Sequence, residues 1–437
     1  MDKVREQAML ALYEVEKRGA YSNMALKEIF GKNKDLAARD KAFITTLVYG
    51  TLKRQITIDY IIGCYSKVKL KKISPYIITV LRMGIYQLGF MDKVPESAAV
   101  NESVALAKRY GHKASAGFVN GVLRNFVRNG YEYPKDKDMY MSVKYSFPQW
   151  ICKMWCEDYG EDFAKELMES MNGEPMMSLR INTLKTDAEK VSGELDNARI
   201  SDVYDYAVLS GGFDISNSKL YKAGYITAQD ISAMTASAVL APKPGERVLD
   251  LCAAPGGKTT HMAQLMENKG SITACDIHAH KLDLIDGNAM RMGIDIIQTV
   301  CIDASKPIAQ WRGRFDKVLA DVPCSGLGII RKKPDIKLKE EENLCGLQYA
   351  ILQRAAEYLR PGGELVYSTC TLNRRENEEI VEKFLKENKG FAAVDMTDIL
   401  PKRFCREEAG RGHITLFPNI DGTDGFFIAK IKRCTDD

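Results

Sequence analysis

Two cysteines in the second half of the 437-residue chain each follow an apolar segment and stand in a turn of small residues. Cys324 lies in ADVPCSGLG, residues 320–328, and Cys370 lies in VYSTCTL, residues 366–372. If the two apolar segments are neighbouring parallel strands, their carboxyl ends share the edge of the sheet where ligands bind. Both thiols would then face one cleft, where a thiolate can act as a nucleophile.

A glycine-rich turn precedes these cysteines. The sequence RVLDLCAAPGGKTTHMAQL, residues 247–265, predicts a strand, a turn and the start of a helix. Gly256 and Gly257 let a ligand approach the backbone, and the free amides of a helix start favour electron-rich groups. A phosphate-binding GxxxxGK[ST] loop would need glycine at Cys252, which weakens a nucleoside triphosphate hypothesis. A dinucleotide turn, GxGxxG, fails because Gly256 and Gly257 are the only glycines between Leu251 and Lys269.

The remaining ligand class is a nucleoside cofactor without a phosphate chain, held by acidic residues at successive strand ends. Asp276 ends the second predicted strand, where a carboxylate can accept both ribose hydroxyls. Asp303 follows the third predicted strand and is expected to meet an adenine amino group. Each aspartate taken alone is typical of a turn or a helix cap, but their repetition after apolar runs favours a binding site.

A thiol beside a methyl donor is suited to alkylation of a pyrimidine carbon. Carbon 5 of cytosine is a weak nucleophile until a thiolate adds to carbon 6, and loss of the carbon 5 proton later expels the thiolate. A protonated carboxyl such as Asp321 could relieve the charge that develops near N3. Lys258 could favour the thiolate or orient the base. Spacing alone leaves open which of the two cysteines attacks.

Three regions of different pattern surround these motifs. Apolar residues from Val4 to Val15 and from Ile77 to Leu88 recur at helical spacing, so residues 1–135 predict an all-α bundle. Residues 136–235 predict a linker and a small α+β region, with helices at 149–159 and 162–172. Residues 236–437 alternate strands and helices, which indicates a mainly parallel sheet covered on both faces. Its predicted strands are 247–251, 271–275, 296–301, 317–320 and 364–367.

Composition and charge narrow the class of protein. Hydrophobic residues make up 45% and charged residues 27%, which is typical of a globular protein. Residues 1–130 hold 22 basic and 11 acidic side chains, a net charge of +11, and the rest of the chain holds 40 basic against 47 acidic, a net charge of −7. A basic module of this kind favours a polyanionic partner. The candidate phosphate contacts are Arg39, Lys53, Arg54, Arg82, Lys108, Arg109, Arg124 and Arg128.

The sequence also predicts where the protein is located and whether it binds a metal. We expect a cytoplasmic protein, because no apolar run is long enough to span a membrane and the first residues do not form a signal peptide. Eleven cysteines without a CxxC pair favour free thiols. No metal site is expected, since the five histidines and the cysteines lack ligand spacing.

The motifs DLCAAPGGKTT, DVPCSG, STCT and GTDGFF together resemble those of the RNA cytosine-C5 methyltransferases of the Nop2/Sun/RsmB type. RDKAFITTLVYGTLK, LRMGIYQL and FVNGVLRNF resemble the NusB-like RNA-binding module of the bacterial 16S rRNA member. The resemblance implies a Rossmann-like methyltransferase domain that uses S-adenosylmethionine. It also implies that Cys370 is the covalent nucleophile and that Cys324 assists release of the product. The implied cofactor contacts are Cys252, Ala253, Ala254, Pro255, Gly256, Gly257, Lys258, Asp276, Asp303 and Asp321.

The resemblance makes 16S rRNA, free or in an assembling small subunit, the expected partner, with no obligate protein partner and no membrane. Two alternatives remain at this stage. A non-catalytic RNA-binding or assembly factor would keep the fold without the chemistry, and the presence of both cysteines argues against it. A P-loop ATPase is disfavoured by Cys252, which stands where that loop needs glycine.

Overall fold

The computed structural model describes residues 2–211 and 215–435 of the chain. It divides into two compact units, which we describe separately. The helical unit comprises Met1–Gly173 together with a later segment, Ile330–Glu340. The sheet unit comprises Glu174–Ile329 and Glu341–Asp437. No helix in the described part of the chain is long and apolar enough to cross a bilayer.

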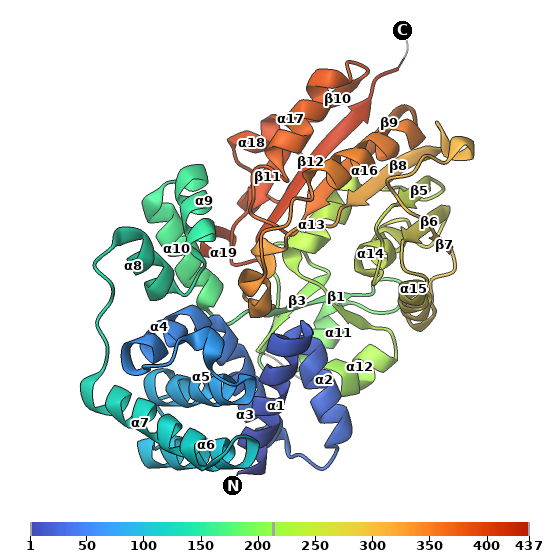
Figure 1. The fold of residues 1–437 in the computed structure, drawn as a ribbon. Helices are drawn as coiled ribbons and strands as arrows, with labels where there is room; N and C mark the ends of the chain where they lie inside the picture. Colours follow the sequence, from blue (N-terminus) through green and yellow to red (C-terminus); the bar gives the residue numbers. More distant parts are fainter. Residues whose placement is uncertain (1, 212–214, 436–437) are drawn as a thin grey trace. The chain divides into compact units, whose positions relative to one another are not determined.

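The helical unit confirms the all-α prediction for the first third of the chain (Figure 1). Asp2 caps the first helix by accepting a hydrogen bond from the Val4 amide, and Gly19 ends it in the left-handed conformation. The helices are α1 (Lys3–Arg18), α2 (Ser22–Lys32), α3 (Ala38–Lys53), α4 (Gln55–Tyr65), α5 (Pro75–Phe90), α6 (Glu96–Tyr110), α7 (Lys113–Asn129), α8 (Lys137–Tyr145), α9 (Gln149–Tyr159) and α10 (Glu161–Asn172).

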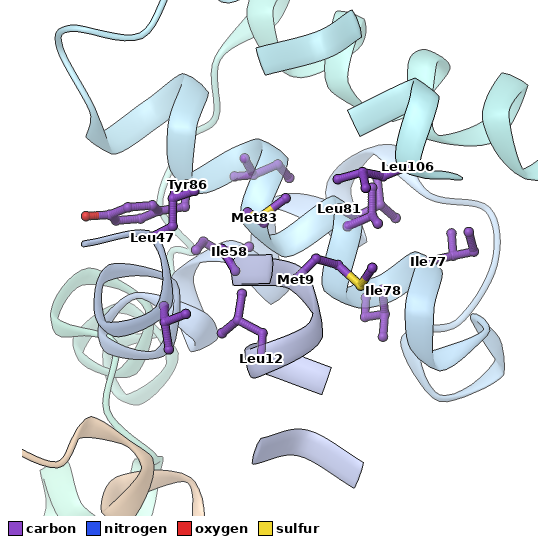
Figure 2. Packing of buried hydrophobic residues seen from close by; sticks show 14 of the residues in the cluster. Met9, Leu12, Leu47, Ile58, Ile77, Ile78, Leu81, Met83, Tyr86 and Leu106 are labelled. Atoms are coloured by element: carbon purple, nitrogen blue, oxygen red, sulfur yellow. The ribbon is translucent and has the colours of Figure 1, made fainter. Parts of the chain in front are cut away.

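Apolar side chains at helical spacing build the core of this unit. Leu12 from α1, Leu47 from α3 and Leu81 from α5 are fully buried in one cluster (Figure 2). The predicted face from Ile77 to Leu88 therefore points inward, as the periodicity indicates. Burial of such side chains stabilises the bundle by about 1.5–3 kcal/mol for each large one.

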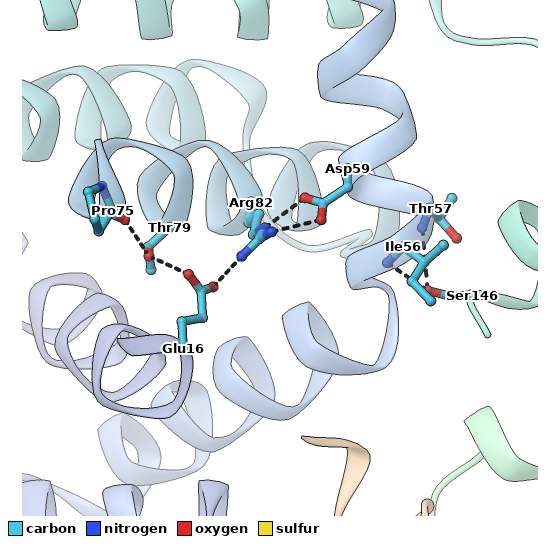
Figure 3. A network of polar contacts seen from close by, with 8 residues as sticks. All are labelled: Glu16, Ile56, Thr57, Asp59, Pro75, Thr79, Arg82 and Ser146. Carbon is cyan, nitrogen blue, oxygen red and sulfur yellow. Dashed lines mark hydrogen bonds and ion pairs between the residues drawn. The ribbon is translucent and has the colours of Figure 1, made fainter. Parts of the chain in front are cut away.

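A polar network also joins helices of the unit (Figure 3). Arg82 on α5 forms ion pairs with Asp59 on α4, at 2.7 Å, and with Glu16 on α1, at 2.8 Å. The Ser146 hydroxyl, just after α8, accepts a hydrogen bond of 3.1 Å from the Ile56 amide on α4. The packing unit extends to Gly173, whereas the domain division at residue 135 stays a prediction.

The segment Ile330–Glu340 is separated in sequence from the helices with which it packs. It contains a 3₁₀ helix, η5 (Pro334–Leu338). Lys337 is fully buried, and its ammonium group donates hydrogen bonds to the Lys53 carbonyl, at 2.7 Å, and to Asn172 Oδ1, at 3.1 Å. Asp335 accepts a hydrogen bond from the Ser22 hydroxyl.

The sheet unit begins with a small antiparallel sheet of strand order β2-β3-β1-β4, which confirms an α+β region in the middle of the chain. Its strands are β1 (Met177–Ile181), β2 (Ala198–Ile200), β3 (Ala207–Ser210) and β4 (Ile226–Ala228). The short helices α11 (Ala188–Gly193) and α12 (Lys219–Lys222) and the 3₁₀ helix η2 (Ile215–Asn217) connect them.

A large mixed sheet follows, with strand order β10-β12-β9-β8-β5-β6-β7 and with β11 paired to β12. The strands β5 to β9 run parallel, as predicted, and β12 is antiparallel to β9. The strands are β5 (Arg247–Asp250), β6 (Ser271–Asp276), β7 (Ile297–Cys301), β8 (Phe315–Asp321), β9 (Leu359–Thr369), β10 (Phe391–Ala393), β11 (His413–Leu416) and β12 (Phe426–Arg433).

Helices cover this sheet on both faces. Successive residues of a strand point to opposite sides, so each strand contributes apolar side chains to both layers. Val248 packs in one apolar cluster and Leu249 in another, and Val366 and Leu365 divide in the same way. The first cluster includes α13 (Ile231–Leu240), α14 (Gly257–Leu265) and α15 (Ala279–Met292), and the second includes α16 (Cys345–Tyr358) and α17 (Glu378–Glu387). The remaining short helices are α18 (Glu407–Gly410), α19 (Pro418–Asp421), η3 (Ala309–Trp311), η4 (Leu327–Ile329) and η6 (Lys402–Phe404).

Candidate functional site

The site lies where the strand order of the large sheet reverses. From β5 the chain proceeds through β6 to β7 on one side, and β8 and β9 add to the other side of β5. In open α/β sheets this switch point leaves a crevice at the carboxyl ends of the strands, where ligands bind. The turn after β5 and the turn after β8 both end there.

The glycine-rich turn connects β5 directly to α14. Gly256 adopts φ +98°, a left-handed conformation that favours glycine, and a Cβ at this position would lie 3.2 Å from the Ile285 Cα atom. α14 begins at Gly257, so the amides of its first turn have no partner within the helix. The turn therefore combines close backbone access with a partial positive charge, as the sequence predicts.

Lys258, in the first turn of α14, forms an ion pair with Asp321 at the end of β8. Its Nζ atom lies 2.6 Å from Asp321 Oδ2, and the ring of Phe426 lies 5.0 Å from the same Nζ atom. The Ser368 hydroxyl donates to Asp321 Oδ1 at 2.8 Å. Burial opposes the charge of Lys258, but Asp321 and, more weakly, Cys370 raise the pKa of the ammonium group.

The two thiols lie together, because β8 and β9 are parallel neighbours. Cys324 follows β8, Cys370 follows β9, and their Sγ atoms are 3.3 Å apart. The hydrogen bond with Cys370 and burial, followed by the negative charges of the neighbours, raise the pKa of the Cys324 thiol well above its ordinary value.

Two glycines allow the backbones around the thiols to pack closely. The Gly328 amide donates to the Cys370 carbonyl at 2.9 Å, and the Gly425 amide donates to the Gly328 carbonyl at 2.9 Å. A Cβ on Gly328 would lie 1.9 Å from the Gly425 carbonyl oxygen. The GTDGFF motif therefore supports the turn that carries Cys324 and the start of the loop that carries Cys370.

The two acidic residues predicted for a nucleoside are at strand ends, as expected. Asp276 is the last residue of β6 and accepts a hydrogen bond from the His278 amide at 2.9 Å. Asp303 follows β7, and its Oδ1 atom accepts from the Ser305 hydroxyl at 2.6 Å and from the Ser305 amide at 3.0 Å. These bonds with Ser305 hold the pKa of Asp303 below its ordinary value. Asp303 thus stabilises a turn, and its contact with adenine stays a prediction.

Sequence reasoning missed several residues that build the site. Arg180 on β1 is fully buried and donates to the Gly257 carbonyl at 2.7 Å and to Thr260 Oγ1 at 2.8 Å, so it supports the start of α14. Asp250 ends β5 and accepts from Thr259 Oγ1 at 2.8 Å, and burial raises the pKa of its carboxyl to about 7. Asp250 carries the same strand-end signal as Asp276, whereas an isolated arginine in a strand carries no such signal.

Two predicted phosphate contacts in the helical unit already have partners within the protein, so their contact with phosphate stays a prediction. Lys53 donates to the Gly173 carbonyl at 2.8 Å and is 6% exposed. Arg82 is held between Asp59 and Glu16. The exposed candidates are Arg39, Lys108, Arg109, Arg124 and Arg128, and Arg109 among them pairs with Glu6 at 3.1 Å. No group of three metal-ligating side chains occurs among the residues that the structure describes.

The large sheet is doubly wound, with a glycine-rich turn at its switch point and carboxylates at its strand ends, and this turn does not match the phosphate-binding GxxxxGK[ST] pattern. This combination is typical of one class of protein, the Rossmann-like methyltransferases. Comparisons agree with this class along the chain. The family described as 16S rRNA methyltransferase RsmB/F matches residues 237–432, the NusB family matches residues 2–128, and a ferredoxin-like domain of the RsmF/B type matches residues 147–209.

Curated relatives match over nearly the whole length. The chain is 37% identical to a probable ribosomal RNA small subunit methyltransferase B of Bacillus subtilis, with 98% of each chain covered. It is 34% identical to the corresponding protein of Synechocystis, with 99% of this chain and 100% of the relative covered. The chain therefore belongs to the RsmB/F family of methyltransferases, whose methyl donor is S-adenosylmethionine.

Two solved structures are similar to this one. The crystal structure of PH0851 shares 29% identity with a TM-score of 0.84, over 98% of both chains. The structure of NSun6 from Pyrococcus horikoshii with SFG, an analogue of S-adenosylmethionine, shares 26% identity with a TM-score of 0.57, over 66% of this chain and 99% of that one. Family membership decides against the ATPase alternative.

Proposed function

We propose that this protein methylates carbon 5 of a cytosine in 16S rRNA and that Cys370 forms the covalent intermediate. The observation that carries this proposal is the thiol pair, with 3.3 Å between its Sγ atoms, beside the Lys258 and Asp321 ion pair at one sheet edge. The names of the curated relatives support rRNA of the small subunit as the substrate. A target base inside RNA must leave its stack to reach such a site.

The reaction begins with attack by the Cys370 thiolate on carbon 6 of the cytosine, which forms the S–C6 bond and shifts electrons toward carbon 5 and N3. Its hydrogen bond with Cys370, its burial and the neighbouring negative charges raise the pKa of the Cys324 thiol, which favours its thiol form. The Lys258 ammonium, coupled electrostatically to Cys370, favours the thiolate of Cys370.

When bound, S-adenosylmethionine supplies the methyl group that carbon 5 accepts. We assign its binding to the turn from Cys252 to Lys258, with Asp276 at the ribose and Asp303 near the adenine. The left-handed Gly256 and the unpaired amides of α14 fit a ligand in close contact with the backbone. After transfer, the Cys324 thiol gives its proton to the departing Cys370 sulfur, 3.3 Å away, as the S–C6 bond breaks, and the Cys324 thiolate so formed takes the proton that carbon 5 loses.

Asp321 faces the base in this scheme. It accepts hydrogen bonds from Lys258 and Ser368, so its carboxyl is fixed in orientation before substrate arrives. We propose that Asp321 contacts the N3 side of the cytosine and that the proton needed there comes through the carboxyl and its lysine partner.

The helical unit holds the RNA backbone in this proposal. Between Asp59 and Asp92 the chain contains no acidic residue. Four exposed lysines, which we call the lysine segment, lie between α4 and α5: Lys67, Lys69, Lys71 and Lys72. Together with the exposed arginines of α3 and α7 they offer phosphate contacts to an rRNA or to an assembling small subunit.

The test is transfer of labelled methyl from S-adenosylmethionine to unmodified small-subunit rRNA, naked and assembled, followed by nucleoside analysis. We expect label in 5-methylcytidine that disappears in Cys370→Ala. Cys324→Ala should instead leave a protein–RNA adduct that survives a denaturing gel. An adduct in Cys370→Ala but none in Cys324→Ala would reverse the assignment, and absence of label with both substrates would overturn the proposed function.

A further inference from the structure

Two buried polar side chains hold the turn that carries Cys324 from both sides. On one side, Gln348 of α16 donates from Nε2 to the Pro323 carbonyl at 2.9 Å. On the other side, Glu376 accepts from the Ser325 amide at 3.0 Å and from the Ser325 hydroxyl at 2.6 Å. The residues before and after Cys324 are thus both fixed by hydrogen bonds.

Glu376 is the centre of this arrangement. Its side chain is 1% exposed and accepts four hydrogen bonds, two on each carboxylate oxygen. Besides Ser325, the donors are Gln348 Nε2, at 2.7 Å, and Asn373 Nδ2, at 2.9 Å. All four partners donate, so an amide in place of the carboxylate would set its own NH₂ group against at least one of them.

The same network reaches the loop of the second cysteine. The Ser325 hydroxyl gives its proton to Glu376, so it accepts one from Thr371 Oγ1, which lies 2.7 Å away. Thr371 directly follows Cys370 in the sequence. One buried carboxylate therefore fixes both turns that bring the two Sγ atoms together.

We propose that Glu376 is a positioning residue for the thiol pair: through Ser325 and Gln348 it holds Cys324 beside Cys370, so that Cys370 attacks and Cys324 serves release. The part of this inference that concerns attack and release rests on the proposed function. The part that concerns the position of Cys324 does not.

Electrostatics at the pair agree with this role. The groups that face Cys324 are Cys370, Glu376 and Asp321, and each of them raises the pKa of the Cys324 thiol, after its hydrogen bond with Cys370 and its burial. Lys258 is a cation of this site. It forms an ion pair with Asp321, and its charge also interacts with Cys370.

The first experiment compares covalent adducts with small-subunit rRNA and S-adenosylmethionine on denaturing gels. Glu376→Gln removes the charge and one acceptor, and Gln348→Met removes the bonds to Pro323 and to Glu376 while it leaves the charge. The matched control is Glu379→Gln, an exposed glutamate of the following helix. We expect at least fivefold more persistent adduct in both buried variants than in the wild type and the control, approaching the level of Cys324→Ala.

The second experiment needs no RNA. Iodoacetamide labels thiolates, and mass spectrometry gives the labelling rate of Cys324 and of Cys370 separately. We expect Glu376→Gln to raise the ratio of the Cys324 rate to the Cys370 rate at least fivefold, and Glu379→Gln to leave it unchanged. Gln348→Met should raise it less, because the charge remains.

The outcomes separate the two proposals. If Cys324→Ala forms an adduct while Glu376→Gln turns over like the wild type with unchanged labelling, the role of Glu376 is overturned and the proposed function stands. If no variant forms an adduct, the covalent mechanism fails and the labelling ratio still decides whether Glu376 controls Cys324. Gln348→Met gives the same decision on positioning if Glu376→Gln does not fold.

Discussion

Replacing Gly328 by alanine should test whether the close backbone packing behind the thiols is needed for catalysis. The added Cβ would lie 1.9 Å from the Gly425 carbonyl oxygen and 2.8 Å from the Cys370 carbonyl oxygen, whereas ordinary contact begins at 3.4 Å. One segment must therefore retreat by about 1.5 Å, the difference between 3.4 and 1.9 Å. Both neighbours are backbone atoms, so no rotation of a side chain can relieve the clash.

The magnitude of the effect follows from this displacement. Overpacking of a well-packed site costs about 1–3 kcal/mol of stability. A displacement of about 1 Å near reacting groups can cost about 100-fold in rate. We expect Gly328→Ala to lower methyl transfer about 100-fold and the thermal midpoint by a few degrees. The affinity for S-adenosylmethionine, measured by calorimetry, should change less than twofold, since Gly328 is not among the residues that we assign to cofactor binding.

Gly346→Ala provides the matched control. Gly346 is exposed in α16, and a Cβ there has nothing within 4 Å. Alanine in place of glycine in a helix stabilises by about 0.5–1 kcal/mol, so this variant should be fully active and slightly more stable. Full activity of Gly328→Ala, or an equal loss in both variants, would refute the argument from backbone packing.

Three further predictions concern other parts of the molecule. Glutamine at all four positions of the lysine segment should lower the salt dependence of RNA binding, the slope of log K against log salt, by about 3, and an unchanged slope would remove this segment from the RNA surface. Burial and the charge of Arg180 hold the pKa of His261 well below 6.5, so below pH 6.5 the unfolded chain binds a proton that the folded protein does not. Stability should therefore fall as pH drops below 6.5, by up to about 1.4 kcal/mol per pH unit, and His261→Leu should flatten that slope in denaturation experiments at several pH values. Arg180→Met should weaken S-adenosylmethionine binding about tenfold, because Gly257 loses a charge-assisted hydrogen bond, and an unchanged dissociation constant would contradict this role.

The positions of the thiols could be predicted because they depend on simple rules. Apolar segments that alternate with helices predict a parallel sheet, and its strand ends share one edge. That reasoning places Cys324, Cys370 and Asp321 together at one sheet edge. The predicted ends of β5 and β6 agree with the observed ends to within one residue.

The groups that hold the thiols could not be predicted in the same way. Ser325 and Glu376 are 51 positions apart in the sequence, and Gln348 lies on another element again. Periodicity reports which residues of one element are buried, but a hydrogen bond between side chains of different elements leaves no periodic trace. Glu376 precedes a helix with other glutamates, so its pattern is typical of a charged helix start exposed to water.

Charge patterns failed for a related reason in the helical unit. Lys53 is followed by Arg54, whereas Arg82 is the one charged residue of α5, and one sequence does not show which of these charges faces another helix. The run RKKPDIKLKEE, residues 331–341, has the composition of an exposed loop, yet Lys337 within it is fully buried over the ring of Phe147, at 4.1 Å. Burial lowers the pKa of this ammonium group well below its ordinary value, and the carbonyl of Lys53 with the amide of Asn172 offsets part of the cost. A buried lysine of this kind is tolerated only where hydrogen-bond acceptors from distant segments converge. Composition alone therefore wrongly predicts that Lys337 is exposed.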